Sequence, residues 1–418
     1  MAQRYNDIAR NFRVEIGEET TFGTKPSGSW PEAMDALQLV HDDLHIEGME
    51  QELLDVGDAH VRRTGAVDAV VGQKRASTWR GSVYLKAIPT ASQLTASGSA
   101  AQLSHRILFR HMFGTETVAV GSTVQTSSTT TSVIAGSGHG SRFTRGSWIL
   151  VEVSGELEPT MVTAISTDTL TVAPALSATP TTNGVIRQGY NYAPKTLSAK
   201  TGSLTLVKSF NSAVQARLLG ACFQGKFNFP EFGKLLTLVL DGKAADWTAP
   251  GALSETATAV SDDMGEAYAY KDSSLLFGDP STLDRSSDRC PFEAFSVDLS
   301  QSQEAILDGT ASSQSQRGWQ DVGGRPYPVT GMLKTSVDVA RYTDFAARTD
   351  FRLVHWVKKG TGTTASFLLW DVPRLFLKMP KPTKLGSRLG IDSPFHGLED
   401  TLGSTTDHDV AALRLVMF

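Results

Sequence analysis

Few residues in this sequence combine the types and the spacing that chemistry requires. Nine histidines are scattered along the chain, and only His41 and His45 are four residues apart, a spacing that places two imidazoles on one helical face for metal binding. His45 begins a segment with strand-like alternation, which separates the two side chains along the chain instead. No Glu completes a His-Glu-x-x-His pattern, so we expect no metal site.

Two glycine-bearing segments could be taken for phosphate-binding loops. Such a loop needs a strand before it and a helix N-terminus after it. GSGHGS (136–141) follows a Ser/Thr tract and leads into a strand, so we expect a flexible loop. VVGQKRASTWRG (70–81) precedes SVYLKAI (82–88), which alternates as a strand, so we interpret it as a connection between strands. Its cations, which we expect to contact a neighbouring subunit or solvent, are Lys74, Arg75 and Arg80.

Acid–base and nucleophilic chemistry has no clear signature in the sequence. No Gly-x-Ser-x-Gly elbow occurs, and neither Cys222 nor Cys290 has a catalytic type of context. The clustered carboxylates, which we interpret as solvated faces or as the lining of a channel in a ring, are Glu47, Glu50, Glu52, Asp55 and those of SDDMGE (261–266). We therefore expect that the protein is not an enzyme and that it has no catalytic, cofactor-binding or metal-binding residues.

Composition narrows the class of protein further. The 418 residues include 40% hydrophobic and 20% charged residues, as in globular proteins. The 39 Lys and Arg against 44 Asp and Glu give a formal net charge of −5, which argues against a nucleic-acid clamp. Two cysteines make no disulfide framework. MAQRYNDIARNF has no apolar core of a secretory signal, and no apolar run approaches the ~18–20 residues that span a bilayer, so we expect a soluble protein made in the cytoplasm.

The elements that would position these residues are mostly strands. Period-two alternation or short β-rich runs occur at 44–49, 148–153, 169–176, 203–207, 292–300 and 412–418. Two segments have helical patterns, 104–114 and 342–357. In the first, Ser104 is a suitable N-cap, Gly114 is a suitable stop, and Ile107, Leu108, His111 and Met112 fall on one face. We predict a mainly β protein with two short helices.

The sequence also contains an internal repeat. Residues 321–333 repeat the layout of 70–81, and an offset of 251 places Gly72 on Gly323, Leu44 on Phe295, Ile46 on Val297 and Glu47 on Asp298. With one residue of gap, Gly81 falls on Gly331. A second block, 218–230, lies over 368–380 at an offset of 150, and closing strands follow at 235–240 and 412–417. We interpret this as a tandem duplication of one β-rich domain with a small β domain inserted in the first copy.

The segment EIGEETTFGTKP (15–26) resembles the opening of tail tube proteins, also called major tail proteins, of long-tailed, non-contractile bacteriophages. In that family a Glu-Thr-Thr-aromatic-Gly-Thr segment precedes the first strand of the tube. The block before SVYLKAI, the helix ending HMFG, the insert with RGSWILVEV and TMVTAISTDTLTVAPAL, and PFEAFSVDLSQSQEAILDG followed by GGRPYPVTGMLKTSV fit the same pattern. The resemblance covers most of the chain.

The resemblance implies two tandem tail-tube-type β-sandwich domains, each with a short helix, plus a small inserted β-barrel-like domain. The expected boundaries are 1–116 and 191–250 for the two parts of the first tube domain, 117–190 for the insert, 251–290 for a linker and 291–418 for the second tube domain. Residues 381–411 have no assigned place within that second domain.

The resemblance also implies a function. Such proteins assemble into rings that stack into the tail tube, a conduit for DNA ejection into the host. A chain with two such domains is expected to form trimeric rings with pseudo-sixfold symmetry, with hexameric rings as the alternative. The implied partners are further copies of the chain, the tape measure protein, and tail terminator and baseplate proteins, while genomic DNA passes through the lumen without specific binding. No membrane is involved, and the protein is expected in the virion tail after synthesis in the host cytoplasm.

Two other classes stay open from the residues alone. One is a carbohydrate-binding or adhesive multi-domain β protein of a virion or cell surface, although its aromatic platforms are not evident because the tryptophans are dispersed at positions 30, 79, 148, 247, 319, 356 and 370. The other is a β-rich hydrolase that uses two carboxylates, whose pairing is set by space rather than by sequence.

Overall fold

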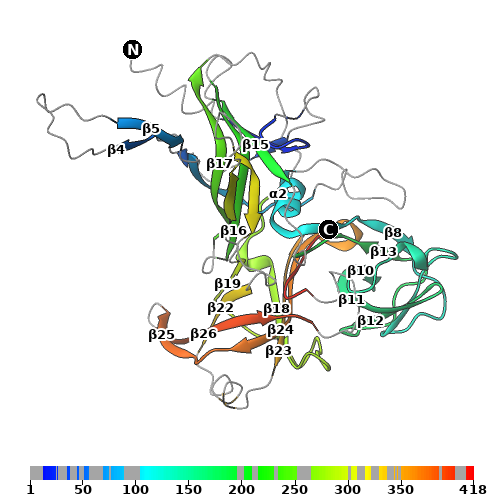
Figure 1. The fold of residues 1–418 in the computed structure, drawn as a ribbon. Coiled ribbons are helices and arrows are strands. Elements are labelled where there is room, and N and C mark those ends of the chain that lie inside the picture. Colours follow the sequence, from blue (N-terminus) through cyan, green and yellow to red (C-terminus); the bar gives the residue numbers. More distant parts are fainter. Residues whose placement is uncertain are drawn as a thin grey trace, which may run out of the picture.

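The protein is mainly β, as the alternation predicted (Figure 1). The computed structural model describes residues 13–24, 26, 35–37, 45–46, 51–55, 69–74, 77–88, 104–194, 202–209, 215–229, 234–251, 265–299, 303–307, 316–321, 329–336, 343, 346, 350–385, 388–400 and 411–418.

Six antiparallel strands, here called the first unit, pair in the order β1–β15–β16–β17–β6–β3. They are β1 (Arg13–Glu19), β15 (Ser203–Ser209), β16 (Gln215–Phe229), β17 (Thr237–Gly251), β6 (Ser77–Tyr84) and β3 (His45–Ile46). A short strand, β2 (Asp35–Leu37), lies beside β1, and a separate hairpin of β4 (Gln51–Asp55) and β5 (Ala69–Lys74) stands between β3 and β6 in the sequence. The segment 70–81, expected as a connection, therefore consists largely of β5 and the start of β6.

Six further strands, here called the second unit, pair in the order β18–β23–β24–β26–β22–β19. They are β18 (Ser273–Gly278), β23 (Phe351–Lys359), β24 (Ser366–Leu377), β26 (Arg388–Leu398), β22 (Val329–Ser336) and β19 (Ala294–Leu299). A hairpin of β20 (Gln303–Leu307) and β21 (Gln316–Asp321) again stands in the sequence between two strands of the unit, β19 and β22. The order of pairing in the first unit is thus repeated strand by strand.

Strand register confirms one predicted alignment and corrects two; the alignments of Leu44, Glu47 and Gly323 lie outside the described residues. Both units carry a β-bulge, between Leu204 and Leu206 in β15 and between Phe351 and Leu353 in β23, and register counted from it across the neighbouring strands places Trp79 on Gly331. Ile46 pairs with Trp79 and Val297 pairs with Gly331, so the offset of 251 that places Ile46 on Val297 is right. The same register places Gly331 on Trp79 rather than on Gly81.

The offset of 150 for the second block is wrong by four residues. Both units carry a β-bulge at the same place, between Leu204 and Leu206 in β15 and between Phe351 and Leu353 in β23. Leu218 faces Leu206, and Val372 faces Leu353, so Leu218 corresponds to Val372, at an offset of 154. A slip of four residues preserves the inward and outward alternation of a strand, so the hydrophobic pattern could not reveal it.

At one equivalent cross-strand pair, the two units have an aromatic residue and a glycine on exchanged strands. Trp79 of β6 faces Gly242 of β17, and the equivalent pair is Gly331 of β22 facing Phe395 of β26. A Cβ atom on Gly242 would lie 2.1 Å from the Trp79 ring, and one on Gly331 would lie 2.1 Å from the Phe395 ring. In each unit an aromatic ring therefore covers a glycine on the neighbouring strand. The ring belongs to β6 in the first unit, but in the second unit it belongs to β26, which is the equivalent of β17.

The helix predicted at 104–114 is confirmed as α2 (Ser104–Phe113). Ile107, Leu108 and Met112 are buried, and Gly114 follows with a φ of 82°, a conformation that ends helices. Met112 packs over Gly225 of β16, so α2 covers the core side of the first unit.

The second predicted helix, 342–357, is wrong over its C-terminal half. Thr343 and Ala346 are helical, but residues from Phe351 onward form β23. That segment is rich in β-branched and aromatic residues and lies between β18 and β24, where such side chains pack on both faces.

The insert forms its own six-stranded sheet in the order β8–β13–β10–β11–β12–β9. Its strands are β8 (Val120–Thr123), β9 (Ser132–Ile134), β10 (Trp148–Val153), β11 (Glu156–Ser166), β12 (Thr169–Ala173) and β13 (Val185–Gln188). The backbone N–H of Gln125 donates to the carbonyl of Ile134, which draws the two ends of the sheet together. A separate hydrophobic cluster fills it, including Val133, Ile149, Val162 and Ile186.

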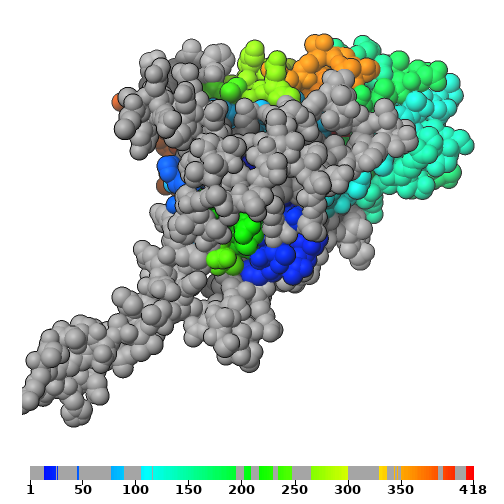
Figure 2. Space-filling model, turned by 90° about the horizontal axis from the view of Figure 1, so that it is seen from above, coloured from blue at the N-terminus to red at the C-terminus, as the bar shows by residue number. Residues whose placement is uncertain are grey.

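The insert leaves the chain from the first unit but packs on the second (Figures 1 and 2). Its Trp148 and Met161 share a buried cluster with Phe367, Leu369 and Val416. Figure 2 shows the insert in cyan to green beside the orange segment of the second unit. The strands at its base, β7 (Gly114–Thr117) and β14 (Tyr190–Pro194), pair with each other, and β14 also pairs with β27 (Arg414–Met417), which lies beside β24.

Parts of the expected linker 251–290 and of 381–411 belong to the second unit. β18 lies within the expected linker 251–290 and pairs with β23 as β1 pairs with β15. In 381–411, β25 (Lys381–Leu385) continues the line of β24 beside β26. Short 3₁₀ turns complete the described elements at Gly140–Arg142 (η2), Tyr270–Asp272 (η3) and Gly362–Thr364 (η4).

Candidate functional site

The two units join edge to edge into one continuous sheet. Residues 226–229 of β16 extend beyond β15 and pair with 295–298 of β19, the outer strand of the second unit. One row of neighbouring residues then crosses both units: Ser82, Val239, Lys226, Asp298, Thr330, His396 and Phe376. The side of the sheet that bears this row is here called the open face, since the core and α2 lie on the other side.

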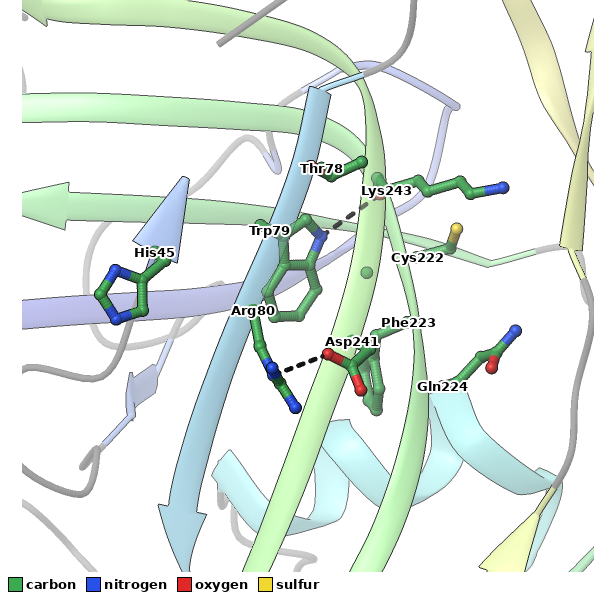
Figure 3. Close-up of a pocket in the computed structure, with 10 residues that line it drawn as sticks. His45, Thr78, Trp79, Arg80, Cys222, Phe223, Gln224, Asp241 and Lys243 are labelled. Carbon is green, nitrogen blue, oxygen red and sulfur yellow. Dashed lines mark hydrogen bonds and ion pairs between the residues drawn. The ribbon is translucent and has the colours of Figure 1, made fainter. Parts of the chain in front are cut away.

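A hollow of about 630 Å³ lies on the first unit (Figure 3). Its lining includes Trp79, Arg80, Cys222, Gln224, Asp241 and Lys243. Arg80 forms an ion pair with Asp241 on the neighbouring strand at 3.0 Å, and the indole N–H of Trp79 donates to the carbonyl of Lys243 at 3.3 Å. Arg80, expected to contact solvent or another subunit, thus already has a partner in its own chain. The side chains of Lys74 and Arg75 lie outside the described residues.

Three cross-strand pairs of opposite charge lie on the described part of the open face. Besides Arg80 and Asp241, Lys334 lies 3.6 Å from Asp392, and Lys226 stands opposite Asp298. Burial raises the pKa of Asp298, Lys226 opposes that rise, and Asp241 adds to it. The described part of this face therefore carries mixed charge. The side chains of the clustered carboxylates Glu47, Glu50, Glu52 and Asp55, and residues 261–264, lie outside the described residues.

The described histidines do not gather into a site. His45 lies on β3, so it shares no helical face with His41, which is outside the described residues. The ring of His105 contacts the carbonyl of Tyr84 at 2.9 Å, and that of His139 contacts the Ser122 hydroxyl at 2.9 Å. Among the described residues, no three His, Cys, Asp or Glu side chains are grouped so that they could hold a metal ion.

The glycine-rich loop 136–141 is held by one carboxylate rather than left free. Asp168 accepts hydrogen bonds from the backbone N–H groups of Gly138 and Gly140, each at 2.9 Å. These bonds lower the pKa of Asp168. The loop's N–H groups thus already bind an anion, a carboxylate of the insert itself, which leaves them no phosphate-binding role.

Sequence reasoning missed two buried carboxylates that organise the units. The first is Glu19, within the segment 15–26. It accepts four hydrogen bonds, from the Ser203 hydroxyl at 2.5 Å, the Thr205 hydroxyl at 2.8 Å, and the N–H groups of Gly23 at 2.7 Å and Gly220 at 2.9 Å. The Glu-Thr-Thr-aromatic-Gly segment thereby folds back over β15 and β16, so this Glu is a structural anchor.

The second is Asp371 of β24, which is fully buried. It accepts a bidentate pair from Arg352 at 2.9 and 2.8 Å, a hydrogen bond from Arg414 at 2.8 Å, and one from the indole N–H of Trp148 at 2.9 Å. Burial alone would raise the pKa of Asp371, but the two guanidinium groups outweigh it and lower that pKa. Because Trp148 belongs to the insert, this ionised cluster fixes the insert on the second unit. Its members are distant in sequence, and no spacing rule could have found them.

Comparison with known proteins adds no relative: no protein-family model and no curated protein matches this chain. Among the described residues, no helix has the length and apolar character needed to cross a membrane.

Proposed function

We propose that the protein is a tail tube subunit of a long-tailed bacteriophage, a structural virion protein whose rings stack into a conduit for DNA ejection. The observation that carries the proposal is the doubled unit joined edge to edge through β16 and β19. A chain with two equivalent units supplies two positions of a ring, so three chains would supply six.

The sheet edges support assembly of this kind. Within the described residues, β25 pairs only with β26, so it presents one unpaired edge. Exposed edges are normally removed by pairing, and a closed ring removes them between chains.

The open face supports a conduit rather than a DNA-binding surface. Its cross-strand charge pairs leave little net field to attract phosphates, and the net charge of the chain is −5. DNA would therefore pass without specific binding. The proposed partners are further copies of the chain, the tape measure protein, and terminator and baseplate proteins in the virion tail, with the chain made in the host cytoplasm.

The adhesive alternative has less support. Its aromatic platforms would need exposed rings, and among the described large hydrophobic side chains that are exposed, Phe376 is the single aromatic one. Trp79, Trp148 and Trp370 are buried in the core.

Electron microscopy of the purified protein tests the proposal. We expect rings or tubes with a channel of duplex width, and native mass measurement of one ring should give three chains. A compact monomer at high concentration, unchanged on addition of tail factors, would overturn the tube function. Six chains per ring would retain the tube and overturn the pseudo-sixfold trimer.

A further inference from the structure

The hairpin of β25 and β26 carries a run of positive charge, although the net charge of the chain is −5. Residues 372–391 contain five cations and no carboxylate. Register places 218–238 of the first unit at the same position, and that stretch has two lysines and one glutamate. The charge run therefore distinguishes the second unit from the first. Its cations are Arg374, Lys378, Lys381, Lys384 and Arg388.

Three of these cations are exposed and unpaired within the described residues. They are Lys378, Lys381 and Lys384, and no described carboxylate forms an ion pair with any of them. Asp392 stands opposite Lys381 in the strand pair, but it lies 3.6 Å from Lys334. The charge pairs of the open face therefore end at Asp392, and the three lysines of the hairpin are left without a counter-charge.

A neighbouring histidine responds to this positive charge. Burial and the charge of Lys378 lower the pKa of His396, which lies on β26 opposite Phe376. A carboxylate close to the pair would oppose this effect, and none of the described carboxylates does so. The positive potential at this end of the second unit is thus not neutralised by the described part of the chain.

The lysines lie on both faces of a two-stranded ribbon. β22 pairs with β26 only as far as Gly390, so 384–385 and 388–389 form a tip that has no third strand among the described residues. Lys381 and Lys384 are three positions apart on one strand, so they point to opposite faces. Figure 1 shows β25 at the end of the second unit that is away from the insert.

We propose that the β25–β26 hairpin binds in a groove of duplex DNA through contacts of Lys378, Lys381 and Lys384 with phosphates. The major groove admits a two-stranded β-ribbon and has phosphates along both of its sides, which matches cations on both faces of the hairpin. Phosphate contacts carry no sequence information, so this binding is non-specific and weakens with salt. It does not depend on the proposed ring function.

Two other anionic partners fit the hairpin less well. An element that lies on a membrane surface has its cations and its apolar side chains on opposite faces. Here Lys384 pairs with Leu389, so a lysine shares a face with an apolar side chain that is 67% exposed. An acidic protein segment bound at one face would leave the lysines of the other face unpaired. Duplex DNA carries a charge about every 1.7 Å of its axis and can reach both faces.

Titration of a labelled duplex of random sequence with the whole protein, followed by fluorescence anisotropy, tests the proposal. We expect binding at about 50 mM salt, with a slope of log Kd against log salt of about 0.9 for each phosphate contact. K378Q/K381Q/K384Q should weaken binding about tenfold or more and reduce that slope by about 3. K381Q and K384Q alone should each reduce it by about 1, which keeps the test valid if the triple variant does not fold.

The matched control removes the same charge elsewhere. K234Q/K271Q/K359Q changes lysines outside the hairpin and should bind the duplex within about twofold of wild type. Equal weakening in this control, or no binding of the duplex by wild type, would overturn the proposal. So would binding of wild type to phosphatidylglycerol vesicles or to polyglutamate without binding to the duplex, since the occupant would then be a membrane or an acidic protein segment. If wild type binds DNA but forms no rings, the tube function fails and this proposal stands.

Discussion

The first and second units share a topology but anchor their buried carboxylates by opposite means. Glu19 in the first unit accepts four hydrogen bonds from hydroxyl and backbone N–H groups, whereas Asp371 in the second is held by two guanidinium groups and an indole. Thr205 and Arg352, which bond these carboxylates, occupy equivalent positions of β15 and β23. Backbone pairing and the bulge are thus the same in the two units, while the side chains at equivalent positions differ. The carboxylate with charged partners, Asp371, lies where the insert packs on the second unit.

Among the variants that test this comparison, the one that removes the charge of Asp371 should lower the free energy of unfolding most. D371N leaves Arg352 and Arg414 buried without a full counter-charge, so we expect about 3–5 kcal/mol less stability. Chemical denaturation measures it, and near-ultraviolet circular dichroism should report the loosened Trp148. The matched control is D350N, whose partly exposed pair with Arg374 should contribute less than about 1 kcal/mol. Equal losses in both variants would contradict a special role for the buried cluster.

Reversing the aromatic–glycine exchange should have the next largest effect. G242F places a ring where Trp79 already lies, and overpacking of this kind costs about 1–3 kcal/mol. Adding W79G reproduces the arrangement of Gly331 and Phe395 in the second unit, so the double variant should recover part of the loss in unfolding free energy. A double variant less stable than G242F alone would mean that the two sites are not interchangeable.

Neutralising Glu19 tests the carboxylate that is held by uncharged donors. E19Q keeps the shape but replaces one acceptor oxygen by an N–H₂ group that faces donors, so we expect a loss of about 1–3 kcal/mol, smaller than for D371N. Thermal unfolding compares the two variants directly. E266Q, at a highly exposed Glu, is the control and should behave as wild type. If E19Q equals D371N, neutral and charged anchoring do not differ in strength.

A pH dependence should arise in the second unit. Burial lowers the pKa of His355 to about 3, whereas an unfolded His titrates near 6.5. Between these values the unfolded chain binds a proton that the folded chain does not, so stability is fully present above about pH 6.5 and falls by about 1.4 kcal/mol per pH unit below it. The ring lies among Phe292, Phe295 and Trp370, so H355F should fit there and remove this slope. A difference between wild type and H355F that stays constant from pH 7 to 5 would refute the assignment.

The smallest effect is expected on the open face. Arg80 and Asp241 have side chains that are 66% and 60% exposed, so their coupling in a double-mutant cycle should be below about 1 kcal/mol and weaken with salt. If R80A leaves stability unchanged but blocks ring assembly, Arg80 has a further partner in another chain.

The sequence predicted strands and their repetition because alternation and spacing are local properties. The offset of 251 is right for Ile46 and Val297, the pair at which the described residues test it. The offset of 150 was four residues off, since any even slip keeps the hydrophobic pattern and only the bulge defines the register. The segment 351–357 has apolar residues on both sides, a pattern that fits a helix as well as a buried strand. It forms a strand because it pairs with both β18 and β24.

The buried carboxylates that anchor the structure could not be predicted from local sequence patterns. Trp148 and Asp371 are 223 residues apart, and neither has neighbours in sequence that mark it. Glu19 lies within the segment 15–26, but its four donors come from three separate parts of the chain.

The docking of the insert on the far unit has a consequence for how fast the protein folds. The pairing of β14 with β27 and the bond from Trp148 to Asp371 join segments more than two hundred positions apart. Closing such large loops costs entropy before any contact compensates it, so these pairings should form late and slowly. Until they form, Trp148 and Phe367 remain accessible to aggregation and to chaperones.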